Sequence, residues 1–225
     1  MRLVLFDVDG TLVDSQAAIH ACMDATFAAF GHEAPPPAAV KGVIGLSLDR
    51  AIERLLDGRD GDPSAMSVSY KDRWPGMQGR PDLQVRFFDG MRNLLDVLAA
   101  REDLILGVVT GKSRRGVAHL VESHGLEHHF LTRRTADDCP SKPHPAMVRE
   151  CCDETGIAPA QTVVVGDTTY DMAMARAAGA GAIGVGWGYH EGAALRRAGA
   201  SMVVETAKEL AECLCVDELP LESQD

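Results

Sequence analysis

Short apolar runs that alternate with helical stretches are the feature that most limits the folds open to this chain. Five runs of strand length occupy residues 3–6, 104–109, 162–165, 182–185 and 202–204. Between them, apolar residues recur at three- and four-residue spacing, as in residues 91–98. Continuous apolar strands that alternate with helices are typical of a parallel sheet covered on both faces. We therefore predict a doubly wound, Rossmann-like α/β fold.

Residues 14–87 lack this alternation and show helical periodicity with no convincing strand. One helical pattern follows Asp14, which can cap a helix, and ends at Gly31. Two more are expected around residues 48–56 and 65–74. The sequence thus predicts a core domain formed by residues 1–14 and 88–225, with a small helical domain, residues 15–87, inserted after the first strand.

Acidic and hydroxyl residues come directly after three of the predicted strands. Asp7 and Asp9 follow the first strand, Thr110 follows residues 104–109, and Asp167 follows residues 162–165, with Asp171 close behind. Because parallel strands end at one edge of a sheet, these side chains should converge there. Carboxylates about 5 Å apart repel by roughly 3 kcal/mol per pair at an effective dielectric near 20, and a bound divalent cation removes this cost. Oxygen ligands alone favour Mg²⁺.

Charge and composition exclude several classes of partner. Lys and Arg number 22 and Asp and Glu 33, so the net charge is −11, which repels a nucleic-acid backbone. No stretch approaches the roughly 18 apolar residues of a membrane helix, and the first apolar run ends too early for a signal peptide. We expect a cytoplasmic protein with no nucleic-acid or membrane partner. The six cysteines contain no C-x-x-C pair and are interpreted as reduced thiols. The sequence does not indicate an oligomeric state.

Four segments resemble, in order, the four motifs of the haloacid dehalogenase superfamily. They are DVDGTLVDS at 7–15, VVTGKS at 108–113, PSKPHP at 140–145 and GDTTYD at 166–171. The helical insert resembles the small helical cap of that family. Within the superfamily, the sequence is most similar to the phosphoglycolate phosphatase group. This resemblance implies a phosphatase that acts on a small phosphorylated metabolite, with phosphoglycolate as the leading substrate.

The resemblance also implies a role for each residue that acts on the phosphoryl group. Asp7 would be the nucleophile that forms an aspartyl phosphate, which splits one displacement into two easier steps. Asp9 would act as general acid and then as general base. Thr110 and the Gly111 amide would bind phosphoryl oxygens, and Lys142 would neutralise the charge of Asp7 and of the phosphate.

The remaining implied roles concern the metal and the substrate. Mg²⁺ would be held by the carboxylates of Asp7 and Asp167 and the backbone carbonyl of Asp9, with Asp171 supporting its bound waters. Substrate specificity would lie in the cap, since GLSLDR at 45–50 resembles the family's specificity loop. A guanidinium suits a carboxylate, so Arg50 is the residue expected to bind that of phosphoglycolate.

Several rival functions share some of these motifs. A phosphosugar mutase of the same fold would use the same Asp7 and Asp9, and a pyrophosphatase or nucleotide phosphatase would share the architecture. These alternatives stay open. A dehalogenase would not need Asp9, because a leaving halide takes no proton. A receiver-like phosphorylation switch also combines acids, Mg²⁺, threonine and lysine. It is disfavoured because receiver domains have about half this length and lack an inserted cap.

Overall fold

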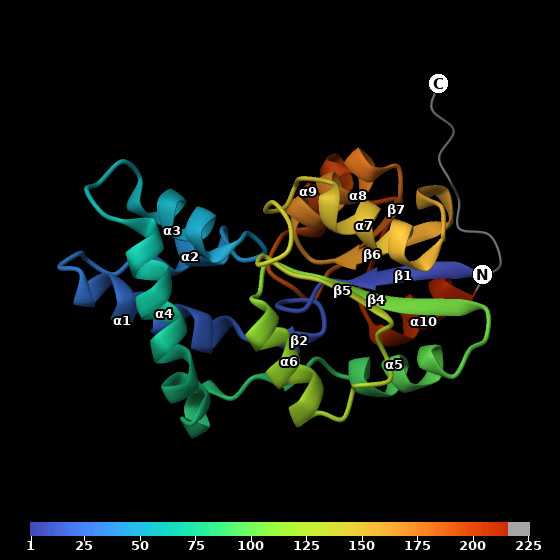
Figure 1. The fold of residues 1–225 in the computed structure, drawn as a ribbon, viewed down its shortest axis with the longest axis horizontal. Coiled ribbons are helices and arrows are strands. Elements are labelled where there is room, and N and C mark those ends of the chain that lie inside the picture. The colour runs from blue at the N-terminus through green and yellow to red at the C-terminus, as the bar shows by residue number, and fades with distance from the viewer. Residues whose placement is uncertain (216–225) are drawn as a thin grey trace.

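The computed structural model describes residues 1–215, apart from the side chain of Gln78, and shows two lobes (Figure 1). The larger lobe is an α/β domain, and the smaller lobe consists of helices. The acidic tail after Cys215, which the sequence predicts to be solvated, lies outside the described residues. No helix in residues 1–215 is both long enough and apolar enough to cross a membrane.

The larger lobe contains a six-stranded, wholly parallel sheet with the order β5-β4-β1-β6-β7-β8. Its strands are β1 (Arg2–Phe6), β4 (Leu104–Val109), β5 (Thr132–Arg134), β6 (Thr162–Gly166), β7 (Gly181–Val185) and β8 (Met202–Val204). From β1 the chain moves outward to β4 and β5, then returns to β6 and proceeds in the opposite direction. The neighbours β1 and β6 therefore form the topological switch point, where doubly wound sheets bind ligands.

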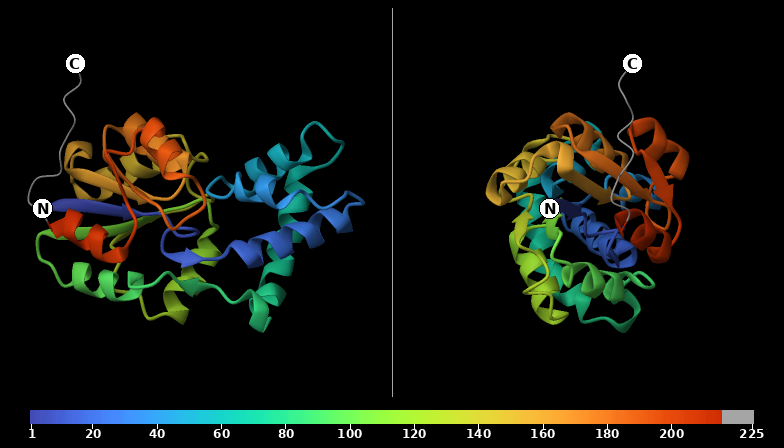
Figure 2. Two further views of the ribbon diagram at one scale, coloured as in Figure 1. Left: turned by 180° about the vertical axis from the view of Figure 1, so that it is seen from behind. Right: turned by 90° about the vertical axis from the view of Figure 1, so that its right-hand side faces the viewer.

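Helices cover both faces of this sheet, which confirms the predicted fold class (Figure 2). One face packs against α5 (Met91–Ala99), α6 (Arg114–Ser123) and α10 (Ala207–Cys215), and the other against α7 (Ala146–Thr155), α8 (Thr169–Ala178) and α9 (Gly192–Ala198). Strand β1 contributes to both layers. Val4 and Phe6 belong to the first core and Leu3 and Leu5 to the second, because successive strand residues point to opposite faces.

The smaller lobe has a hydrophobic core of its own. It comprises α1 (Gln16–Ala29), α2 (Pro37–Lys41), α3 (Leu48–Leu56) and α4 (Pro63–Gln78), packed around residues such as Phe27, Ile52 and Met66. Helix α4 begins where the Asp62 side chain accepts hydrogen bonds from the backbone of Ser64 and Ala65, which satisfies two amides left unpaired at a helix start. We call residues 15–87, which include this lobe, the cap.

A short antiparallel pair of strands, β2 (Val13–Asp14) and β3 (Arg86–Phe87), connects the two lobes. The expectation of no strand between residues 14 and 87 was therefore wrong at both margins of the insert. Each strand is only two residues long and carries no periodicity. Strand β5 was also unpredicted, because its sequence Thr-Arg-Arg lacks an apolar run. Two short 3-10 helices, η1 (Pro81–Leu83) and η2 (Pro159–Gln161), complete the described elements.

Candidate active site

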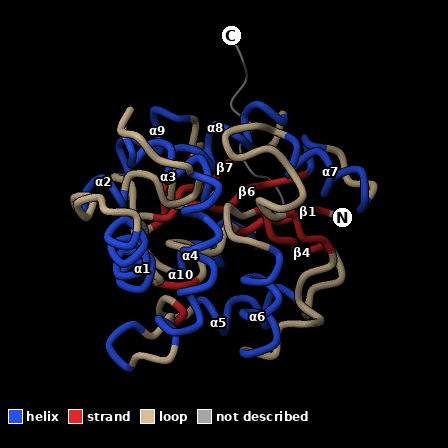
Figure 3. Tube along the Cα trace, turned by 60° about the vertical axis from the view of Figure 1, so that its left-hand side comes forward, coloured by secondary structure: helices blue, strands red, loops and turns tan. Residues whose placement is uncertain are grey.

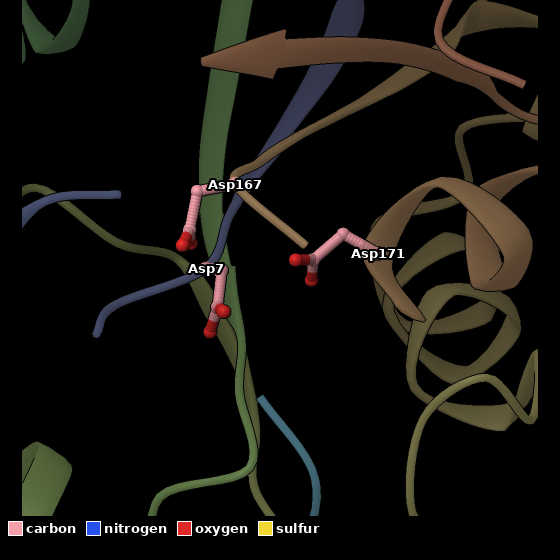
Figure 4. A group of neighbouring side chains, drawn as sticks. All are labelled: Asp7, Asp167 and Asp171. Atoms are coloured by element: carbon pink, nitrogen blue, oxygen red, sulfur yellow. The ribbon is translucent and has the colours of Figure 1, made fainter. Parts of the chain in front are cut away.

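Three buried carboxylates meet at the switch point, near the carboxyl ends of β1 and β6. In Figure 3 the cap helices α1, α3 and α4 lie in front of the sheet. Asp7 directly follows β1, Asp167 directly follows β6, and Asp171 lies in the first turn of α8. One oxygen from each lies within 4.8 Å of the others, and Figure 4 shows the three carboxylates converging. The pairing of Phe6 with Val165 brings the ends of the two strands together. Three of the four predicted carboxylates therefore converge in the structure, whereas the Asp9 carboxylate is not part of this group.

Asp167 is held in place by hydrogen bonds to both of its carboxylate oxygens. The Thr11 hydroxyl donates to Oδ1 at 2.9 Å, and the Tyr189 amide donates to Oδ2 at 2.9 Å. Gly10 and Gly188 lie so close that a Cβ atom at either position would overlap the Asp167 side chain. Gly10 also has φ +87°, a conformation that favours glycine. Main-chain segments from two different loops therefore fix the position of this carboxylate.

Lys142 is fully buried between two of the acids. Its Nζ lies 2.9 Å from Asp7 Oδ1 as an ion pair and donates a hydrogen bond of 2.6 Å to Asp171 Oδ1. The other Asp171 oxygen accepts hydrogen bonds from the Thr168 amide and hydroxyl at the start of α8. Both oxygens of Asp171 are thus engaged by the protein. In this structure, Asp171 positions Lys142 beside Asp7.

The cluster contains three carboxylates, and the ammonium of Lys142 forms ion pairs with two of them. Burial raises the pKa of Asp7 to about 7, against the opposing attraction of Lys142. The pKa of Asp167 is raised well above its usual range, first by burial and then by Asp171 and Asp7. Burial lowers the pKa of Lys142, but Asp171 and Asp7 outweigh it and the net pKa is raised. Lys142 is therefore a permanent ammonium that faces several carboxylates.

The cluster suits a hard divalent cation. Asp7 Oδ2 is buried and has no hydrogen-bond partner within the part of the chain that the structure describes. A buried carboxylate oxygen without a partner is costly, and oxygen-rich clusters of this kind are the sites that Mg²⁺ prefers. The carboxylate oxygens of the cluster, with Asp7 Oδ2 left unpaired, therefore fit a Mg²⁺ ion.

Asp9 lies near this cluster and has a separate set of contacts. The Ser15 hydroxyl donates to Asp9 Oδ1 at 2.6 Å, and Lys112 Nζ lies 2.9 Å from each of the two carboxylate oxygens. The Ser15 amide in turn donates to the Tyr189 hydroxyl at 3.1 Å. Ser15, Lys112 and Tyr189 were not among the predicted site residues. Ser15 and Lys112 lie inside the motifs at 7–15 and 108–113, and this position was the signal that could have identified them.

The residues expected to bind phosphoryl oxygens lie at the end of β4. Thr110 is buried, and its hydroxyl accepts a hydrogen bond from the Lys112 amide at 3.2 Å. Gly111 packs against the loop before α3, residues 45–47, which we call the cap loop. A Cβ atom at Gly111 would overlap the Leu46 carbonyl of this loop. The same loop is held by a 2.8 Å hydrogen bond from the Ser47 amide to the Ser141 hydroxyl. The cap loop thus contacts the core directly at the site.

A cavity of about 380 Å³ extends from Asp7 and Asp9 between the core and the cap. The structure does not bring Arg50 to this cavity. Its guanidinium pairs with Glu53 of the same helix at 2.7 Å, and its side chain is 66% exposed. The buried residues of α3 are Ala51, Ile52, Leu55 and Leu56, which places Arg50 on the opposite side of the helix.

Comparison with known proteins agrees with this geometry. A family model of haloacid dehalogenase-like hydrolases matches residues 4–185. A phosphoglycolate phosphatase of Chromobacterium violaceum is 32% identical over 93% of this chain and 95% of its own length, and one of Thiobacillus denitrificans is 26% identical over 94% of each. The solved structure of a hydrolase from Pseudomonas syringae superposes with a TM-score of 0.83 at 24% identity, covering 95% of this chain and 97% of that one. The chain therefore belongs to the haloacid dehalogenase-like hydrolases.

Proposed function

We propose that this protein is a Mg²⁺-dependent phosphatase that hydrolyses a small phosphorylated metabolite through an aspartyl-phosphate intermediate. The observation that carries the proposal is the buried Asp7 carboxylate, paired with Lys142 at 2.9 Å and lining a cavity that Asp9 also lines. Phosphoglycolate is the leading substrate, supported by the names of the two curated relatives. We assign residues 1–14 and 88–225 to the catalytic core and residues 15–87 to the cap.

In the first half-reaction, an Asp7 carboxylate oxygen attacks phosphorus. A bond forms between this oxygen and phosphorus while the bond from phosphorus to the ester oxygen breaks. Asp9 donates its proton to the departing oxygen, so the product leaves as a neutral alcohol. Lys142, Thr110 and the Gly111 amide would bind and balance the charge of the phosphoryl group during the transfer.

In the second half-reaction, water attacks the phosphorus of the aspartyl phosphate. The carboxylate of Asp9 takes a proton from this water, and the bond between Asp7 and phosphorus breaks. Asp7 and Asp9 return to their starting states, and the net reaction consumes one water to give an alcohol and inorganic phosphate. The Ser15 and Lys112 contacts hold the Asp9 side chain in one place for both proton transfers.

Mg²⁺ would be held by the Asp7 and Asp167 carboxylates and the Asp9 carbonyl. When bound, it supplies positive charge that stabilises the transferring phosphoryl group. Asp171 would act indirectly, because its oxygens hold Lys142 and cap α8.

The proposed function is tested by a screen of phosphate esters, pyrophosphate, nucleotides and hexose phosphates with Mg²⁺, in which release of inorganic phosphate is measured. Phosphate release from a small ester is the expected result. Isomerisation of a hexose phosphate without phosphate release would instead identify a mutase.

Asp9→Asn should lower kcat/KM unequally for different leaving groups. Asparagine cannot donate the carboxyl proton. For an ester with a poor alkoxide leaving group, kcat/KM should therefore fall about 100-fold, which is the lower end of the contribution of general acid catalysis. An activated aryl phosphate such as p-nitrophenyl phosphate leaves without protonation and should lose far less. The measurement is kcat/KM for both esters, since this quantity reports the steps up to departure of the alcohol. Equal losses would show that Asp9 serves mainly to maintain the structure of the site.

A further inference from the structure

Lys112 holds the Asp9 side chain in the reaction described above, and its other surroundings point to a second role. Its ammonium contacts both oxygens of Asp9 at 2.9 Å, and its side chain is only 13% exposed. It also lies 5.0 Å from the centre of the Trp74 ring, which belongs to the cap. Lys112 thus connects the general acid of the core with a wall of the cavity. All three residues line that cavity.

The position of Lys112 relative to Asp9 limits where a substrate substituent can lie. The leaving oxygen must come within hydrogen-bond reach of Asp9 to receive its proton. A substituent on the carbon that carries this oxygen therefore lies close to the Lys112 ammonium. An ammonium has three N–H donors, and the two contacts to Asp9 leave one for a ligand. A carboxylate at that carbon would form a charge-assisted hydrogen bond, which is stronger than a neutral one.

Other cations at the cavity have different partners. Lys71 lies 3.9 Å from Asp137, and the Arg115 guanidinium donates to the Lys71 carbonyl at 2.9 Å. The Lys71 side chain is 43% exposed, so its charge is screened by water. The ammonium of Lys112 is less exposed and contacts the proton donor itself. Lys112 is therefore the cation best placed to select a charged leaving group.

The cap wall of the same cavity is apolar and aromatic. Tyr70 and Trp74 stack with ring centres 5.7 Å apart and an angle of 20° between their planes. Ile19, Met23 and Leu46 line the cavity with them. A volume of about 380 Å³ falls within the range of about 300 to 1,000 Å³ typical of sites for larger ligands. The cavity also contains the polar phosphoryl site at Asp7 and Thr110, and the two-carbon acid of phosphoglycolate carries no apolar side chain that would contact this wall.

We propose that the substrates are phosphate esters of 2-hydroxy carboxylic acids that carry an apolar side chain. Lys112 binds the carboxylate, and the wall formed by Tyr70 and Trp74 packs against the side chain. Phosphoglycolate is the smallest member of this class. The inference rests on the proposed phosphatase function and adds the leaving-group chemistry to it.

Two matched pairs of esters test the inference. Phosphoglycolate is compared with ethyl phosphate, and 2-phosphooxy-3-phenylpropanoate with 1-phenyl-2-propyl phosphate, so that methyl replaces carboxylate within each pair. The wild-type protein with Mg²⁺ should prefer the carboxylate in each pair by about 10- to 100-fold in kcat/KM, and prefer the phenyl acid to phosphoglycolate. Lys112→Met should remove most of the carboxylate preference, as expected for one charged hydrogen bond. Trp74→Ala should remove most of the phenyl preference.

Arg50→Ala is the matched control, because Arg50 is a cap cation outside the cavity, and it should leave both preferences unchanged. Equal losses on all four esters in Lys112→Met would overturn the inference, since Lys112 would then act only through Asp9. The inference would also be overturned if the wild-type protein preferred neither the carboxylate nor the phenyl side chain. This second outcome does not depend on whether Lys112→Met folds. Hydrolysis of p-nitrophenyl phosphate keeps the two proposals distinguishable. If this ester is cleaved but the preferences are absent, the phosphatase assignment stands and the substrate class does not.

Discussion

Asp7→Asn should abolish phosphate release, with a loss of at least about 10⁴-fold in kcat, because an amide is a very poor nucleophile. The substitution preserves the shape of the side chain and removes one charge from a buried group of three carboxylates. The fold should therefore persist. Because burial raises the pKa of Asp7 to about 7, its charged form is disfavoured, and the neutral asparagine should not lower the unfolding temperature.

The control for this experiment is Asp14→Asn, the same chemical change at an exposed position in the same motif. It should leave kcat within about twofold of wild type, since exposed substitutions away from a site have small effects. Labelled phosphate from substrate should be trapped on the wild-type protein and on Asp14→Asn, but not on Asp7→Asn. Activity of Asp7→Asn within tenfold of wild type would exclude the covalent mechanism.

The sequence predicted the strand-end acids well because the physical rule behind them is local. An apolar run long enough for a buried strand sets where the strand ends, and parallel strands bring those ends to one edge. Asp7 and Asp167 therefore could be placed together although 160 residues separate them. Lys142 and Asp171 were identified only through the resemblance of their motifs. Without that resemblance, a lysine next to Pro143 would be interpreted as a surface loop residue.

The contacts of Asp9 could not be predicted from spacing. Lys112 is 103 positions away and Tyr189 comes from the loop after β7, so the meeting of these side chains depends on how the loops pack. The expectation for Arg50 relied on the motif and ignored helix phase. Residues 51, 52, 55 and 56 form the buried side of α3, so position 50 necessarily falls on the other side. The spacing of these apolar residues in the sequence already indicates that Arg50 points away from the buried side of the helix.

Removal of divalent cations should abolish activity, and addition of Mg²⁺ should restore it. Asp7, Asp167 and Asp171 bring carboxylate oxygens within 4.8 Å of one another. In residues 1–215, the side-chain ion pairs of this cluster come from a single ammonium, that of Lys142. The loss of the ion leaves the incoming phosphate facing uncompensated negative charge, a cost of several kcal/mol in the transition state or about 10³-fold or more in rate.

Ca²⁺ should substitute poorly, because it takes oxygen ligands at about 2.3–2.6 Å with loose geometry, whereas Mg²⁺ requires about 2.0–2.1 Å and an octahedral arrangement. Asp167→Asn provides a readout independent of turnover. Mg²⁺ should raise the unfolding temperature of the wild-type protein, as any ligand of the folded state does, and raise that of the variant less at equal concentration. Full activity in excess chelator would contradict the metal assignment. An equal thermal shift in both proteins would instead place the ion away from Asp167. The two measurements together therefore separate the need for a cation from its location at the end of β6.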